Sequence, residues 1–334
     1  MIIWREIFNF FCIFLQTGQI MDKKSKPVHI IINPHSGAND AIVFLDSLCN
    51  ELIKLGYQIQ KYTTQYAGDG ARYAREIAAN SASAVVAFGG DGTVNEIASG
   101  LADSDVPILI AASGTENLLS KELKLPRDPA ELANILDSGL VHNCDMGMIN
   151  DRTFHSIIGV GFDAEVVKRV TDARTGHITH FTYVMPIIKT LKEHTYPHIT
   201  VHADDKEIFT GRGLVFVGNI SRYSSGLRIC KNAKYDDGLL DLVVFKCDNS
   251  SKLLLHAART MIGSHEVAKS CIYKQVKNIK VTSDEPTHTQ VDGDLGPEMP
   301  IEIKLAPYKN RLFVPKSRTN KFVFPGWLWK RNNK

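Results

Sequence analysis

The residues best suited to phosphate chemistry lie in one glycine-rich segment, Gly89–Glu96, which reads Gly-Gly-Asp-Gly-Thr-Val-Asn-Glu. An apolar run, Ala84–Phe88, precedes it and a helical pattern follows, so the segment is predicted to join a strand to a helix. Glycines let the backbone approach a ligand, and a helix start offers free N–H groups to an anion. Asp91 would repel phosphate unless a metal ion or its bound water bridged them. The alternative is a tight turn in which Asp91 caps the helix.

Two acidic turns in the second half of the chain could supply a metal site and a base. Asp236 and Asp237 precede Gly238, and carboxylates near main-chain carbonyls in such a turn suit Mg²⁺. Asp292 and Asp294 flank a glycine; one could accept the proton of a substrate hydroxyl while the other holds metal or orients the first. Each is also an ordinary Asp-Gly turn. The second is interpreted as catalytic because phosphoryl transfer needs a base beside the phosphate loop.

The elements that must position these residues follow the pattern of an α/β domain. Buried strands are predicted at Val28–Ile32, Gln58–Thr63, Ala84–Phe88 and Val106–Ile110. Helical patterns separate them, which indicates a parallel sheet with helices on both faces. Such sheets bind ligands at the carboxyl ends of their strands. The loops expected to converge there on one nucleotide lie near Asn33, Thr64, Gly89 and Gly114.

From about Asp145 the pattern changes to short strands separated by turns. Strands are predicted at Thr153–Ile158, His198–Ala203, Gly213–Gly218, Leu239–Phe245, Ile272–Val281 and Ile301–Leu305. Helical patterns are fewer, so this half is predicted to be a mostly β domain of the sandwich type. The predicted divisions are an N-terminal extension (1–26), an α/β domain (27–144), a β-sandwich domain (145–316) and a C-terminal tail (317–334).

The composition is that of a globular protein. Of the 334 residues, 44% are hydrophobic and 22% are charged, close to globular averages. The net charge of +3 does not argue for a nucleic-acid partner, and it favours an anionic membrane surface only weakly. The six cysteines form no C-x-x-C pair. Their spread argues against a zinc site or a disulfide framework and fits a reducing compartment.

Both ends of the chain are rich in apolar and aromatic residues. Met1–Leu15 has large apolar side chains at helical spacing, but it is too short and too interrupted to span a bilayer. It is interpreted either as an interfacial anchor or as a mis-called start, with Met21 as the true beginning. The tail Phe322–Arg331 is aromatic and basic, and is either docked on the fold or in contact with a membrane interface.

Six motifs occur in an order that resembles the diacylglycerol kinase catalytic family, which includes soluble bacterial diacylglycerol kinases and the sphingosine and ceramide kinases. The motifs are Asn33–Gly37, Gly89–Glu96, Gly114–Asn117, Gly159–Asp163, Asp236–Asp241 and Asp292–Asp294. The resemblance covers about Val28 to Val314. The order of six motifs is far more specific than the G-G-D-G-T element alone, which NAD kinases and phosphofructokinases share.

The resemblance implies an ATP- and Mg²⁺-dependent lipid kinase with its active site in a cleft between an α/β domain and a β-sandwich domain. The positions that would hold ATP are Asn33, Pro34, His35, Ser36, Gly37, Thr64, Gly89, Gly90, Asp91, Gly92, Thr93, Val94, Asn95, Glu96, Gly114 and Thr115. Asp91 would also belong to the catalytic magnesium network, and Asp292 and Asp294 would be the base and its partner. Asp237, with main-chain oxygens near Lys234 and Leu239, would bind a structural Mg²⁺.

Two departures from the family pattern leave the acceptor open. The family's D-G-E glutamate is Asp294 here, one methylene shorter, so either Asp292 or Asp294 could be the base. Soluble bacterial diacylglycerol kinases often have Asn-Asp in the fourth loop, whereas here Asn117 is followed by Leu118.

We expect a cytoplasmic protein with peripheral membrane contact that meets a diacylglycerol-like or long-chain lipid at the membrane surface. A nucleic-acid partner is not expected, and a homodimer is left open. Two alternatives remain. One is a kinase of a soluble substrate, such as an NAD kinase. The other is a nucleotide-binding regulator without catalytic activity.

Overall fold

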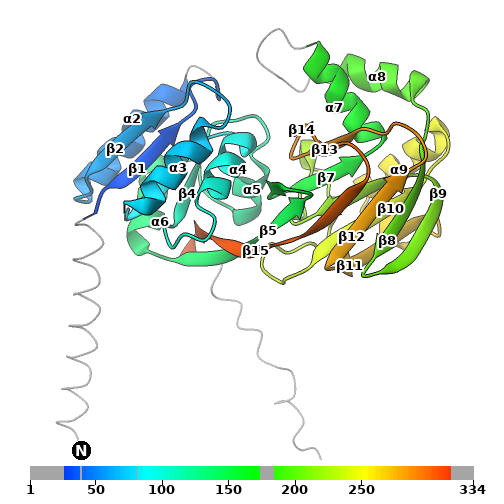
Figure 1. Cartoon of the computed structure of the whole chain (residues 1–334). Coiled ribbons are helices and arrows are strands. Elements are labelled where there is room, and N and C mark those ends of the chain that lie inside the picture. Colours follow the sequence, from blue (N-terminus) through cyan, green and yellow to red (C-terminus); the bar gives the residue numbers. More distant parts are fainter. Residues whose placement is uncertain (1–25, 38–39, 81, 174–183, 317–334) are drawn as a thin grey trace, which may run out of the picture.

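The computed structural model describes residues 26–37, 40–80, 82–173 and 184–316, and Figure 1 shows two domains side by side. An α/β domain is followed by a mostly β domain, which confirms the predicted fold class. Apart from Lys26, the predicted N-terminal extension (1–26) and C-terminal tail (317–334) lie outside the described residues. No helix in the described ranges is long and apolar enough to cross a bilayer.

The first domain alternates strands and helices. Its strands are β1 (Val28–Ile32), β2 (Ile59–Thr63), β3 (Ala84–Gly89) and β4 (Ile108–Ala112). Its helices are α2 (Asp40–Lys54), α3 (Asp69–Ala79), α4 (Asp91–Gly100), α5 (Leu118–Leu123) and α6 (Pro129–Ser138). The strands pair in parallel in the order β2-β1-β3-β4, so the loops that follow β1, β3 and β4 leave the same edge of the sheet.

The hydrophobic pattern of this domain explains its layers. Every residue of β3 is buried, as expected for a central strand of a parallel sheet covered on both faces. Helix α2 buries Leu45, Leu48 and Leu52, whose 3–4 spacing places them on one face. Helix α6 begins where the side chain of Asp128 accepts a hydrogen bond from the amide of Glu131 (2.8 Å). These contacts fix the sheet edge that carries the glycine-rich loops.

The second domain is built mainly from short antiparallel strands. In chain order, its strands are β5 (Val141–Ile149), β6 (Arg152–Phe154), β7 (Ile157–Val160), β8 (His198–Ala203), β9 (Lys206–Gly218), β10 (Leu240–Lys246), β11 (Cys271–Val276), β12 (Asn278–Ser283), β13 (Thr289–Val291), β14 (Asp294–Leu295) and β15 (Ile301–Phe313). The helices are α7 (Phe162–Asp172), α8 (Val184–Glu193) and α9 (Ser250–Met261), with single turns at Ser224–Gly226 and His265–Val267.

Strand β9 belongs to both layers of this domain. Its first half pairs with β8, and its second half pairs with β7 and β10. The side chains between the layers form an apolar core that includes Val215, Val217 and Val281. The prediction of a single strand at Ile272–Val281 is wrong in one respect. This segment forms two strands, because the chain changes sheet at Lys277. Strand β11 then pairs with β10, while β12 pairs with β8 and β15.

Strand β15 connects the two domains (Figure 1). Its first half pairs with β12 and with the end of β5, and its second half pairs with the start of β5. Leu312 also lies opposite Ile108 of β4 in the first domain. A register shift between Leu305 and Lys309 separates the halves. Only the first half of this strand, Ile301–Leu305, was predicted from the sequence. The predicted domain boundary at 144/145 falls within β5.

Candidate functional site

Three loops meet at the carboxyl edge of the parallel sheet. A Cβ placed on Gly114, after β4, would lie 2.6 Å from the Cα of Gly90, after β3. A Cβ placed on Gly37, after β1, would lie 2.9 Å from the carbonyl oxygen of Ser113, and Gly37 has a φ of 109°. The hydroxyls of Ser36 and Ser113 are 3.0 Å apart. Backbones this close require glycine at Gly37 and Gly114.

Asn33 and Thr93 tie the first loop to the glycine-rich turn. The Nδ2 of Asn33 donates to Oγ1 of Thr93 (2.9 Å), and its Oδ1 accepts from the amide of His35 (3.0 Å). Thr64, after β2, donates its amide to the carbonyl of Ile32 (2.9 Å), directly beside Asn33. The predicted ATP residues with exposed side chains at this edge are Pro34, His35 and Thr115.

Two of the predicted ATP residues have other partners in the structure. The side chain of Val94 is buried in the core of the first domain. The carboxylate of Glu96 accepts hydrogen bonds from the amides of Gly68 (3.0 Å) and Gly70 (3.1 Å), at the start of α3. Both side chains therefore have a clear structural role, and their contact with ATP stays a prediction.

Asp91 is the first residue of α4, and its carboxyl lies near the start of a different helix, α5. Burial, and then the nearby carboxylate of Asp292, raise the pKa of Asp91 to about 6, although the amides of residues 117–119 oppose the effect. The N-cap residue of α4 is Gly90, so the alternative in which Asp91 caps α4 is wrong. Asp91, which follows β3, instead faces the amides of the loop that follows β4.

Asp292 is held firmly by the second domain. Its Oδ2 accepts from the amide of His155 (2.8 Å), and its Oδ1 accepts from the amides of Ser156 and Ile157 (2.9 Å each). The backbone of Asp292 has a φ of 51°, as the tight turn requires. Burial raises the pKa of this carboxyl, although the three amides and His155 oppose the effect. Asp292 therefore fixes the turn to the segment that leads into β7.

Asp294 is the accessible carboxylate of the same turn. Its side chain is 68% exposed. Its Oδ2 lies 3.9 Å from the position that a Cβ on Gly92 would occupy. Arg152 lies beside it, with Nη2 3.4 Å from Oδ2 of Asp294 and Nη1 donating to the carbonyl of Leu295 (2.7 Å). The second domain thus presents an exposed carboxylate to the glycine-rich turn of the first.

A buried polar network that was not predicted from the sequence joins the two domains next to this turn. Nδ1 of His155 lies 3.0 Å from Oδ1 of Asn95, and Nε2 lies 2.8 Å from Oδ1 of Asn310. Asn310 donates to the carbonyl of Ala98 (3.0 Å), and Asn95 donates to the carbonyl of Thr153 (3.1 Å). Burial lowers the pKa of His155. Asn95 was predicted to contact ATP. Of the residues in this network, it alone belongs to a motif that could be recognised in the sequence.

The predicted structural magnesium turn lies beside the paired strands β5 and β15. Oδ1 of Asp237 accepts from the amide of Leu239 (3.2 Å), and Oδ2 of Asp145 accepts from the amide of Gly238 (2.9 Å). Lys309 lies 2.7 Å from the other oxygen of Asp145. Asp145 was not among the residues predicted for this site.

The electrostatics of this turn fit a cation only in part. Burial raises the pKa of Asp237, and the carboxylates of Asp145 and Asp236 add to the effect. In the part of the chain that the structure describes, no group of three or more His, Cys, Asp and Glu side chains is arranged to bind a metal. A magnesium site here therefore depends on the main-chain oxygens of Lys234 and Leu239.

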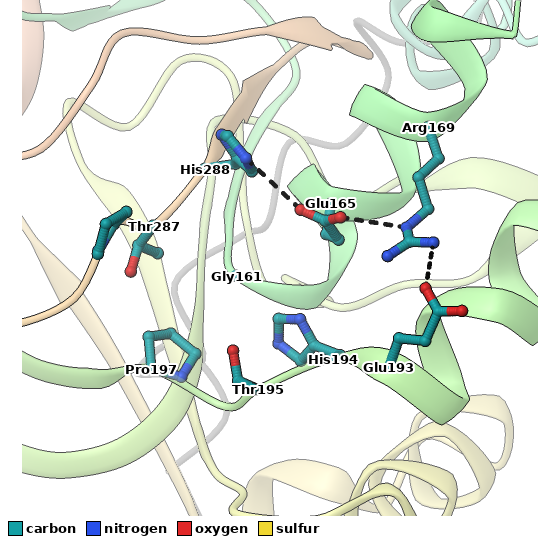
Figure 2. Close-up of a pocket in the computed structure, with 10 residues that line it drawn as sticks. Gly161, Glu165, Arg169, Glu193, His194, Thr195, Pro197, Thr287 and His288 are labelled. Carbon is teal, nitrogen blue, oxygen red and sulfur yellow. Dashed lines mark hydrogen bonds and ion pairs between the residues drawn. The ribbon is translucent and has the colours of Figure 1, made fainter.

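A polar cavity of about 150 Å³ lies in the second domain (Figure 2). Arg169 of α7 contacts Glu165 (3.1 Å) and Glu193 (2.7 Å), and His288 lies 3.6 Å from Glu165. Because charged and polar side chains dominate its wall, this cavity is unsuited to an acyl chain. The lining residues are Gly161, Glu165, Arg169, Glu193, His194, Thr195, Pro197, Pro286, Thr287 and His288.

An α/β domain with glycine-rich loops at its carboxyl edge, faced by a carboxylate-bearing turn of a β-sandwich domain, has the architecture of a two-domain kinase. Residues 27–149 match the diacylglycerol kinase catalytic domain, and residues 156–314 match the YegS C-terminal NAD kinase beta sandwich-like domain. The chain therefore belongs to the diacylglycerol kinase catalytic-domain family, as its motifs predicted.

Relatives named diacylglycerol kinase align with most of the chain. One from Bacillus subtilis is 26% identical over 281 residues, which are 83% of this chain and 92% of the relative. One from Mycobacterium tuberculosis is 27% identical over 308 residues, 90% of this chain and 99% of the relative. A crystal structure of a diacylglycerol kinase from Bacillus anthracis shares the fold, with a TM-score of 0.70 at 24% identity over 88% of this chain and 98% of that chain.

Proposed function

We propose that this protein is an ATP- and Mg²⁺-dependent lipid kinase that phosphorylates the hydroxyl of a diacylglycerol-like or other long-chain lipid. The observation that carries the proposal is the approach of Asp294 to Gly92, which places an exposed carboxylate beside a loop suited to phosphate. Phosphoryl transfer requires a phosphate cradle and a correctly placed base, and little covalent chemistry from the protein. The kinase family of the chain supports the same reaction type.

The three convergent loops would bind ATP. Free amides at the start of α4 and the side chains of Asn33 and Ser36 would donate to phosphate oxygens, and their fixed positions would favour the charge that develops during transfer. Asp294 would accept the proton of the attacking hydroxyl, because it is the exposed carboxylate of the turn. Asp292, with three amide partners, would hold the turn in place.

Asp91 and Asp292 fit a role beside magnesium. They are close enough that the charge of Asp292 raises the pKa of Asp91, and a bound cation would relieve this repulsion. Mg²⁺ would there offset negative charge on the phosphates of ATP. The second site proposed for Mg²⁺ consists of the Asp237 carboxylate and the main-chain oxygens of Lys234 and Leu239.

We infer that the acceptor lipid is met at a membrane surface. The polar wall of the 150 Å³ cavity in the second domain supports this proposal. An acyl chain that left the membrane for this cavity would exchange hydrocarbon neighbours for charged ones, which is unfavourable. The acyl part would remain in the membrane while the hydroxyl reached Asp294.

Incubation of the full chain with ATP labelled in the γ-phosphate tests the proposal. Parallel reactions contain total lipid extract or NAD, each with Mg²⁺ or with EDTA, and mass spectrometry identifies the labelled product. We expect a phosphorylated lipid that forms only with Mg²⁺. Labelled NADP without labelled lipid would contradict the proposal and favour a soluble-substrate kinase. ATP binding without turnover on any lipid, unchanged in Asp294→Glu, would contradict it and favour a regulator.

A further inference from the structure

We propose that the outward face of α9 is a docking surface for a bilayer that contains anionic lipids. Four large apolar side chains of this helix face solvent: Leu254, Leu255, Met261 and Ile262, which we call the α9 surface. The purpose of the docking rests on the proposed lipid kinase function, because a lipid kinase must reach its acceptor at a membrane. The binding itself requires neither ATP nor catalysis.

The four side chains of the α9 surface lie together on one side of the helix. They are between 48% and 77% exposed. At 100° per residue, their positions along the chain place them within an arc of about 120°. Single exposed apolar residues are common on protein surfaces, but a group of large ones on one face indicates a contact with another apolar surface.

The opposite face of α9, which packs on the second domain, carries polar side chains. His256 and Thr260 are the buried residues of the helix, and Leu253 is partly buried beside them. Nε2 of His256 lies 3.2 Å from the carbonyl oxygen of Lys246. A surface helix normally turns its apolar face to the core and its polar face to water. Helix α9 largely reverses this arrangement, so packing within the domain does not explain its apolar residues.

Cationic side chains lie beside the α9 surface. The helix contains Lys252 and Arg259 but no carboxylate. Nη1 of Arg259 donates to Oγ of Ser270 (3.4 Å), which places the exposed Lys269 close to the last turn of the helix. Lysine and arginine beside an apolar helix face are typical of surfaces that bind anionic membranes. The headgroups attract the cations, while the apolar side chains enter the boundary of the acyl chains.

The carboxylates nearest to α9 along the chain do not cancel this charge. Asp248 lies 2.7 Å from Lys252, and Glu266 lies 2.7 Å from Lys231. In the part of the chain that the structure describes, the ion pairs include neither Arg259 nor Lys269. A second copy of the chain on this surface would bring the same cations together, whereas anionic headgroups would neutralise them. The charge therefore favours a membrane over a homodimer here.

Helix α9 is attached to the helices beside the candidate site. Oγ of Ser250, its first residue, donates to the carbonyl of Leu191 near the end of α8 (2.5 Å). Glu193, at the end of α8, contacts Arg169 of α7 (2.7 Å). Helix α7 follows β7, which pairs with β13 just before the turn that carries the proposed base. A bilayer bound at α9 would thus be held by the domain that carries this base.

Sedimentation of the full chain with vesicles, without nucleotide, tests the α9 surface directly. The vesicles contain phosphatidylglycerol and phosphatidylcholine in equal amounts. The double variant Leu255→Gln with Ile262→Gln changes side chains that already face solvent, and we expect its binding constant to be at least about tenfold lower. The matched control is Ile42→Gln with Val43→Gln, which are 70% and 67% exposed on α2. This control should bind as the wild type does. Absence of wild-type binding, or equal binding by the α9 variant, would overturn the proposal.

The substitution Lys269→Gln tests the electrostatic part of the docking, and does so even if the double variant fails to fold. We expect about fivefold weaker binding to the mixed vesicles and unchanged binding to vesicles of phosphatidylcholine alone. The control Lys206→Gln removes an exposed lysine at the start of β9 and should bind as the wild type does. An equal loss in the two variants would overturn the assignment of the charge effect to α9.

Sedimentation velocity distinguishes a bilayer from a second copy of the chain. We expect the wild type and the Leu255→Gln, Ile262→Gln variant to have the same oligomeric state. A wild-type dimer that this variant dissociates would overturn membrane docking and assign the α9 surface to a homodimer.

Activity on two forms of the acceptor separates the docking from the proposed function. A wild type that phosphorylates no lipid would contradict the kinase function, while vesicle binding would still decide the docking. With an active enzyme, we expect the α9 double variant to phosphorylate long-chain diacylglycerol in vesicles about tenfold more slowly. Its rate on a short-chain, water-soluble diacylglycerol should equal that of the wild type. The wild-type rate on both substrates would overturn the docking and leave the kinase function supported.

Discussion

At the scale of single residues, the three aspartates of the candidate site differ mainly in their surroundings. Burial raises the pKa of both Asp91 and Asp292, and the carboxylate of Asp292 accepts three hydrogen bonds from backbone amides. Asp294 is exposed and faces Gly92. The sequence could select all three by type and spacing. It could not rank them, because the groups that surround Asp91 and Asp292 come from segments distant in the chain.

Substitution of Gly92 separates a role in phosphate binding from a role in folding. A Cβ at this position meets nothing closer than Oδ2 of Asp294 at 3.9 Å, so Gly92→Ala should fold with an unchanged melting temperature. The methyl group would occupy space beside Asp294 that the phosphates need, so we expect KM for ATP to rise at least about tenfold. Gly114→Ala, which would clash with Gly90, should instead lower the melting temperature. Unchanged KM in Gly92→Ala would contradict phosphate binding at this turn.

The buried Asp163 carboxyl predicts a specific pH dependence of stability. Its pKa rises from an ordinary 3.8 to about 6 on folding, chiefly through burial. Between these values the folded state binds more protons than the unfolded state, so this group makes the free energy of unfolding fall as pH rises. Asn cannot titrate. The free energy of unfolding of Asp163→Asn minus that of the wild type should therefore increase from pH 4 to pH 7. Urea denaturation at several pH values measures it, and a flat or decreasing difference would contradict the assignment.

At the level of elements, helix α5 could not be predicted from the sequence. It has six residues, too few for a 3.6-residue period to be recognised. The change of sheet between β11 and β12 was missed for a related reason, because the run has the same strand propensity on both sides of Lys277. Buried strands with a continuous apolar run, such as β1 (Val28–Ile32), could be predicted with their bounds.

Substitution of Glu96 tests whether this residue, predicted to bind ATP, instead stabilises the start of helix α3. Because its carboxylate holds the first amides of α3, Glu96→Ala should lower the free energy of unfolding by about 1–2 kcal/mol and leave KM for ATP unchanged. Chemical denaturation and steady-state kinetics measure the two effects. The control Glu76→Ala, on the exposed face of α3, should change neither. A raised KM with normal stability would instead place Glu96 in the ATP site.

At the scale of the whole molecule, β5 and β15 and the buried polar network decide how the two domains face each other. The order of the motifs was sufficient to predict two domains of the correct classes. The contacts between them were not predictable, because His155 and Asn310 are ordinary polar residues in strand-rich segments until the fold brings them together. The same holds for Asp145, whose partners lie in the turn at Gly238 and on β15.

Substitution of Asn310 tests whether this network makes the two domains unfold as one unit. Asn310→Ala would leave Nε2 of His155 and the carbonyl of Ala98 without their buried partner. We expect a loss of about 2–4 kcal/mol in the free energy of unfolding, and broader or separated transitions in calorimetry. Asn143→Ala, on the exposed side of β5, is the control and should change little. A single transition of normal stability in Asn310→Ala would show that the β-strands alone hold the domains.

The rate of lipid phosphorylation by Asp294→Asn at saturating ATP and Mg²⁺ shows whether Asp294 is the base. Asn keeps the size of the side chain and removes its capacity to accept a proton, so we expect a kcat at least about 100-fold lower with unchanged ATP binding and melting temperature. Asp46→Asn, whose side chain is 63% exposed on α2, should keep wild-type activity. Asp294→Asn activity within about twofold of the wild type would contradict the role of Asp294 as the base.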